Sequence, residues 1–268
     1  MAAQPVQPPA PLPDAPIAIA RRVFAGFFLA GLLLSFLGAI LPAWGHHRTE
    51  NFLAAGAYFL SLNLGLLLGA RLAYGLIARK GIKTNLILGC SLACGGFLLL
   101  ALVGPPRLWI LRCLGLLLIG GGAGFLLSGL LETLSPIYER DRAVTVNLVG
   151  ALFGLGCLVT SLLVAGTFFV YTVPSILILL AVIPGYFIAI YARMKPPRLT
   201  SENEPRFLEA IREFRNPGVV LFVLLLFFQF GNEWALAGWL PLFLILRLGL
   251  SPETALEMLA FYLSLIHI

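Results

Sequence analysis

Charged residues are scarce in this chain of 268 residues. They make up 11% of it, whereas a soluble domain contains about 25%, and hydrophobic residues make up 60%. The chain therefore has too little polar surface for a water-soluble protein, and we expect an integral membrane protein. Cysteine is sparse as well. Four cysteines lie in apolar runs without a CxxC pair, so they predict neither a disulfide framework nor a metal site: Cys90, Cys94, Cys113 and Cys157.

The signatures of pumps and membrane enzymes are also missing. The sequence has no GxxxxGK[ST] nucleotide loop, and it has no HxxxxD, paired-aspartate or Ser/His/Asp set of the kind that a lipid-modifying transferase needs. We therefore expect no enzymatic activity and no cofactor. Residues 1–20 contain six prolines and a single charge, Asp14, with no positive stretch before an apolar core. They predict a disordered tail instead of a cleavable signal peptide.

What the chain does contain is long apolar runs. A hydrocarbon core of about 30 Å takes roughly 20 helical residues to cross. Seven complete runs meet the requirement: 23–44, 51–77, 84–103, 108–131, 143–169, 173–192 and 218–246. The predicted fold class is all-α, a polytopic membrane helix bundle. An eighth run begins near Glu253 and stops with the chain at Ile268. Because a chain end inside an apolar run would leave backbone groups unpaired in lipid, we expect an N-terminal fragment of a longer protein. It stays open whether 264–268 are native.

The basic residues predict an orientation. With the N-terminus in the cytoplasm, the cytoplasmic segments carry thirteen Lys and Arg, and the outer loops carry three, Arg48, Arg107 and Arg247. This bias follows the positive-inside rule. It accounts for the net charge of +6 without a nucleic-acid partner. We expect the protein in a bacterial inner membrane.

The spans are divided into two groups by one long loop. Residues 194–217 form the longest connection, and its apolar positions at helical spacing predict a short amphipathic helix at the cytoplasmic surface: Phe207, Leu208, Ile211 and Phe214. Before it lies a six-helix bundle over 21–193, and after it begins a second bundle over 218–268. Stripes of small residues predict close helix packing within the first bundle, with Ala57, Ser61, Gly65, Gly69 and Ala73 in the second span, Gly121, Gly124 and Ser128 in the fourth, and Gly150, Gly154 and Gly156 in the fifth.

Three polar side chains interrupt the seventh span. Gln229, Asn232 and Glu233 have the spacing i, i+3, i+4 that shares one helix face. A carboxylate at mid-membrane depth costs a few kcal/mol and normally faces a bundle interior or a water-filled path. These residues therefore predict a site for substrate binding or for a coupling proton. The alternative is a structural hydrogen bond to a neighbouring helix.

Four further residues are candidates for the same site, and each has a structural alternative. Trp239 could stack on a sugar ring or anchor the helix at the interface. Glu132 could bind the substrate or a coupling ion, or it could lie exposed near the cytoplasmic end. Asn63 could line a cavity or form a hydrogen bond with a neighbouring helix. Arg112 could be a cavity cation or an outer-end residue whose charge reaches water.

The arrangement of six spans, a long charged loop and resumed spans resembles the major facilitator superfamily. Its members have two six-helix halves, with substrate bound between them. The loop after the second span resembles the family signature GxxxDRxGRR, with Gly81 as the later glycine and Arg79 and Lys83 at two basic positions. The resemblance implies a cytoplasmic gate at these three residues. Ala78 stands where the signature has Asp, so the charge relay of that Asp is not implied.

A narrower resemblance points to fucose-permease-like sugar transporters. It rests on Asn147-Leu148, on 153–156 and on the seventh span. In the fourth span, Arg112 followed by Gly115 and the Gly120–Gly124 run is similar to the superfamily's Arg-x-x-x-Gly pattern, with two residues instead of three between Arg112 and Gly115. Leu131-Glu132-Thr133 resembles a proton-coupling segment of that permease. Its proline comes one residue sooner here, and 23–44 has no acidic residue, so proton symport is not implied.

Together the resemblances imply secondary active transport by alternating access. The expected partners are the lipid bilayer, a small polar solute with a sugar-like compound first, and a proton or cation as a candidate coupling ion. We expect a symporter and a monomer. Efflux of amphipathic, drug-like solutes is the alternative, against which the fifth span lacks the Pro-containing glycine motif of antiporters. A membrane-embedded lipid-modifying enzyme is the competing class.

Overall fold

The computed structural model describes residues 15–45, 52–103, 109–194 and 214–266. Within these ranges the regular secondary structure is helical, and six helices are long and apolar enough to cross a membrane. The predicted all-α membrane bundle is therefore confirmed. The helices are α1 (Ala15–Ile40), α2 (Phe52–Leu102), α3 (Trp109–Arg140), α4 (Arg142–Thr167), α5 (Val173–Ala192), α7 (Pro217–Leu248) and α8 (Pro252–Ile266).

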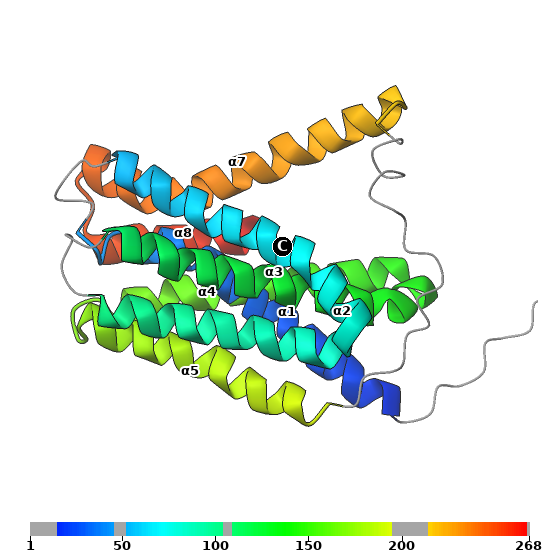
Figure 1. Cartoon of the computed structure of the whole chain (residues 1–268). Coiled ribbons are helices and arrows are strands. Elements are labelled where there is room, and N and C mark those ends of the chain that lie inside the picture. Colours follow the sequence, from blue (N-terminus) through cyan, green and yellow to red (C-terminus); the bar gives the residue numbers. More distant parts are fainter. Residues whose placement is uncertain (1–14, 46–51, 104–108, 195–213, 267–268) are drawn as a thin grey trace, which may run out of the picture.

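The longest helix, α2, contains two of the predicted spans. It has 51 residues, and its regular geometry is interrupted at Gly81, where φ is 82° and ψ is 165°. At 1.5 Å per residue, a helix of this length is more than twice as long as a bilayer core is thick. The break at Gly81 lets the chain turn back, so that 52–80 and 82–102 run side by side with α3 (Figure 1).

Some boundaries differ from the sequence prediction. Helix α1 begins at Ala15, inside the segment predicted as a disordered tail, because Pro16 in the first turn removes no intrahelical hydrogen bond. Helix α3 continues to Arg140, past the boundary predicted at 131, since a charged residue ends an apolar run without ending a helix. The predicted amphipathic helix falls almost entirely on 195–213, outside the described residues.

Local capping explains where the later helices start and stop. The side chain of Asp141 accepts a hydrogen bond from the Val144 N–H at the start of α4, and Asn216 accepts one from Gly218 before α7. Pro217 occupies the first turn of α7, and Gly249 ends that helix with φ at 66°. These caps satisfy backbone groups that the helix ends leave unpaired.

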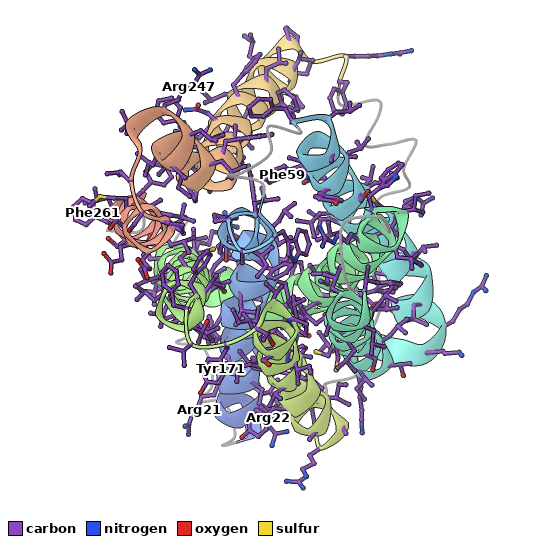
Figure 2. The ribbon with its side chains drawn as sticks, turned by 90° about the vertical axis from the view of Figure 1, so that its left-hand side faces the viewer. Arg21, Arg22, Phe59, Tyr171, Arg247 and Phe261 are labelled. Atoms are coloured by element: carbon purple, nitrogen blue, oxygen red, sulfur yellow. The ribbon has the colours of Figure 1, made fainter. Side chains whose placement is uncertain are left out.

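Helix α1 lies at the centre of the bundle. Figure 2, viewed from the end where α2 begins and α7 ends, shows α1 surrounded by the other helices. Its side chains are the most completely buried of the core, including Leu29, Leu32, Leu33, Phe36, Leu37 and Ile40. Helix α4 packs along α1, and α5 packs along α2. The first six spans thus form one body.

Small residues set the distance between α2 and α3, as the sequence predicts. Gly65 and Gly69 meet the backbone of α3 at Leu117 and Gly121, so closely that a Cβ at Gly65 would lie 2.9 Å from the Gly121 nitrogen. In lipid, such backbone proximity supplies the dispersion contacts that hold helices together. The glycines of the fifth predicted span, now α4, differ in how closely they pack against other helices. Gly156 meets the backbone of Phe28, whereas Gly150 faces open space.

The α2–α3 contact predicts a position-dependent effect of added volume. Gly65→Leu should lower the free energy of unfolding by roughly 1–3 kcal/mol through overpacking. Gly56→Leu, at a glycine of the same helix with no neighbour within 4 Å, is the matched control and should unfold like the parent. Thermal unfolding in detergent measures both. Equal melting temperatures for the two variants would contradict the packing assignment.

The turn at Gly81 predicts a second effect. Its φ and ψ lie in a region that L side chains essentially do not adopt, so Gly81→Ala should destabilise the protein by about 1–3 kcal/mol. Gly75→Ala, in the helical part of α2 with no neighbour within 4 Å, should be neutral or slightly stabilising. A Gly81→Ala variant as stable as Gly75→Ala would show that the turn relaxes without strain.

Candidate functional site

Helix α7 divides into a packed end and an exposed end. Gly238, Pro241 and Leu242 are buried near its C-terminus, whereas every residue from 221 to 232 is exposed. Figure 1 shows the same division, with α7 close to α2 at one end and diverging from the bundle at the other. Helix α7 thus touches the first six spans over only part of its length.

The packed end is a contact of glycines and aromatic rings. Gly38 of α1 meets the backbone of Ala237, and a Cβ at Gly238 would lie 2.5 Å from the Phe59 ring of α2. The Trp239 ring lies 5.6 Å from the Phe59 ring and 6.1 Å from the Phe52 ring, centroid to centroid. We call Gly38, Phe59, Gly238 and Trp239 the α7 contact. Figure 2 shows Phe59 on the side of α2 that faces α7.

On the diverging part of α7, two of the predicted polar residues are joined. The Gln229 side-chain amide donates a 2.7 Å hydrogen bond to the Glu233 carboxylate. Glu233 is half-buried, and its carboxyl group interacts electrostatically with the Tyr262 hydroxyl of α8. Asn232 is exposed. The sequence spacing therefore predicts the Gln229–Glu233 neighbourhood, and the structure adds Tyr262.

The direction of this polar pair follows from helix geometry. Glu233 lies five residues before Gly238, which at 100° per residue places the two about 140° apart around α7. Gly238 faces α1 and α2, and the polar pair accordingly lies on the side of α8. Among the described residues, no hydrogen bond or ion pair links Glu132 or Asn63 to Glu233.

The polar candidates of the first six spans lie in separate places. Glu132 is exposed on α3, and Asn63 is exposed on α2, where its amide donates a 2.8 Å hydrogen bond to the Phe59 carbonyl. Arg112 is buried, and its guanidinium carbon lies 4.9 Å from the Trp44 ring centroid. A cation over an indole ring is attracted by the ring's electrons. Arg112 is thus held at the α1–α3 junction.

The three residues of the signature-like loop lie at the end of the bundle opposite the α7 contact. Arg79 is exposed, Gly81 has its positive φ, and Lys83 is half-buried. The Thr84 hydroxyl donates a 3.0 Å hydrogen bond to the Lys80 carbonyl, which closes the first turn after the break. The glycine assigned from the signature is the residue at which the backbone turns.

Sequence reasoning missed four residues that organise this region: Gly38, Trp44, Phe59 and Tyr262. Each makes its contact with a residue outside its own helix, so periodicity along one span carries no sign of it. Only Gly38 left a signal, as one of several small residues spaced along α1. Its partner on α7 could not be read from the sequence.

The arrangement suits hydrogen bonding to a polar solute better than covalent chemistry. Carboxylate oxygens accept hydrogen bonds and an amide both donates and accepts, so Gln229 and Glu233 together match a hydroxyl-bearing molecule. Within the described residues, no group of three or more His, Cys, Asp or Glu could hold a metal ion.

Comparison with known proteins identifies the family. A family model for the Major Facilitator Superfamily matches residues 23–268, and the first membrane-length helix that the structure describes begins only four residues earlier, at Ile19. No curated protein matches the chain. The match supports the superfamily predicted from the sequence, while the sugar-transporter subgroup stays a prediction. The chain therefore belongs to the major facilitator superfamily, a family of membrane transporters, and is an integral membrane protein.

Proposed function

We propose that the protein carries a small polar solute across the membrane by alternating access, with a sugar-like compound as the first candidate. The observation that supports the proposal best is the position of α7. It meets α1 and α2 at one end only and leaves 221–232 exposed (Figure 1). A helix held at one end can close against the bundle at the other end when that first contact opens.

The α7 contact suits a seal that opens and closes. The helices approach closely because positions 38 and 238 are glycine, and aromatic rings of α2 and α7 cover the contact against water. None of the four residues of the contact is charged. With the N-terminus in the cytoplasm, as the basic residues predict, this contact is on the outer side. The conformation described here is then closed to the outside and open to the cytoplasm.

The polar residues of α7 supply the proposed solute contacts. Glu233 and Gln229 would hydrogen-bond solute hydroxyls, and Tyr262 would add a hydroxyl from α8. Glu233 is also the candidate for exchange of a coupling proton. Asn232, Trp239, Glu132, Asn63 and Arg112 remain proposed contributors from both halves. The loop residues Arg79, Gly81 and Lys83 would take part in closing the cytoplasmic side.

Efflux of an amphipathic solute is the second candidate function. It is favoured by the aromatic side chains Phe222, Phe227 and Phe228, which are exposed on the same part of α7 as the polar pair. Such a surface would accept an apolar ring system beside a polar group. Screening sugars and amphipathic cations in the same vesicles distinguishes the two functions.

Loss of the Glu233 charge should abolish most transport. In proteoliposomes, the parent protein is screened against radiolabelled monosaccharides, and Glu233→Gln should lower the initial rate at least tenfold for any solute that is carried. Glu257→Gln, at an exposed glutamate of α8, is the matched control and should stay within twofold. An unchanged rate in Glu233→Gln would remove this carboxylate from the mechanism.

The glycine at the α7 contact predicts a second effect on transport. Gly238→Leu should prevent α7 from seating against Phe59 and should reduce uptake at least fivefold. Gly95→Leu, at a glycine of α2 with no neighbour within 4 Å, should transport like the parent. Melting temperatures verify that both variants fold. Full activity of folded Gly238→Leu would contradict a role of the contact in gating.

A further inference from the structure

A basic pocket lies between α1 and α5 at the end of the bundle where α1 begins and α5 ends. Its volume is about 140 Å³, and it is lined by Arg22, Tyr186, Ala189, Ile190 and Arg193. None of these residues is acidic. The α7 contact lies at the other end of α1, where Gly38 meets α7 and Phe59 of α2 meets Gly238. The pocket therefore stands apart from the proposed solute pathway.

The two arginines are held together by the backbone. The Arg22 guanidinium donates a 3.1 Å hydrogen bond to the Arg193 carbonyl at the C-terminus of α5. This bond uses one of the five N–H donors of the guanidinium. It fixes Arg22 at the C-terminus of α5, and both arginines line the pocket. Two like charges at such a site are stabilised by an anion that both can contact.

An apolar track leads along α5 into the pocket. Ile178, Val182 and Tyr186 follow one another at i+4 spacing, and they are 51%, 61% and 66% exposed. Residues at this spacing share one helix face, and Tyr186 belongs both to the track and to the pocket. A ligand that fits has an anionic group for the arginines and a hydrocarbon chain for the track.

We propose that this pocket binds the phosphate headgroup of an anionic phospholipid, with one acyl chain along α5. Guanidinium groups form bidentate hydrogen bonds with phosphate, and basic pockets between membrane helices are suited to acidic lipid headgroups. Arg22 and Arg193 contact the phosphate, and Tyr186 packs between the headgroup and the chain. Figure 2 shows Arg22 where α1 lies beside α5.

Native mass spectrometry of the whole chain tests the site, with dioctanoyl phosphatidylglycerol as the probe. Arg193→Gln is the principal variant, because the Arg22 hydrogen bond goes to the backbone of Arg193 and survives the change. It should raise the dissociation constant at least tenfold, and Arg22→Gln should do the same. Arg21→Gln removes the same charge from the neighbouring exposed residue, outside the pocket lining, and should stay within twofold.

Two further binding measurements test whether the pocket recognises an anionic lipid. Dioctanoyl phosphatidylcholine, which has no net charge, should bind at least tenfold more weakly than dioctanoyl phosphatidylglycerol. Glycerol 1-phosphate should not displace the lipid at equal concentration. Unchanged binding of phosphatidylglycerol to Arg193→Gln would overturn the site. Equal binding of phosphatidylcholine, or displacement by glycerol 1-phosphate, would overturn its assignment to an anionic lipid.

Discussion

A carboxylate in the middle of an apolar helix has to be stabilised by water or by hydrogen-bond partners, and this constraint governs the interpretation of α7. Hydrocarbon offers neither, so an ionisable residue at this depth is rare without a function. Gln229 donates to Glu233, and Tyr262 lies within electrostatic reach. Gln229 is exposed and Glu233 is half-buried, on a segment where α7 diverges from the bundle. We propose that a water-filled cleft along that segment surrounds the pair.

The position of α7 is set by residues that lack side chains. Helices in lipid associate through close packing, because no hydrophobic force drives them together. Gly65 and Gly69 bring α2 against α3, and Gly156 brings α4 against α1. Gly38 and Gly238 do the same for α7, but only near its end. Close approach at glycine therefore builds both the six-helix body and the limited contact with α7.

The sequence predicted those features that depend on local order along the chain. Run length predicted the spans, and i+4 spacing predicted the Gln229–Glu233 neighbourhood. Sequence-based prediction failed where contacts join different helices. The packing of separate helices determines two such contacts, that of Arg112 with the Trp44 ring and that of Tyr262 with Glu233. No single span encodes this packing. The direction of the polar pair was missed for the same reason, since it depends on which face of α7 meets α2.

The environment of the polar pair is the most direct test of this account. A nitroxide on Gln229→Cys, in a background without the native cysteines and reconstituted in nanodiscs, reports collisions with a water-soluble nickel chelate and with oxygen dissolved in lipid. A nitroxide on Val182→Cys, at the exposed apolar face of α5, provides the lipid reference. The account predicts that nickel contact dominates at 229 and oxygen contact dominates at 182. Oxygen-dominated contact at both positions would place the pair in lipid and contradict the cleft.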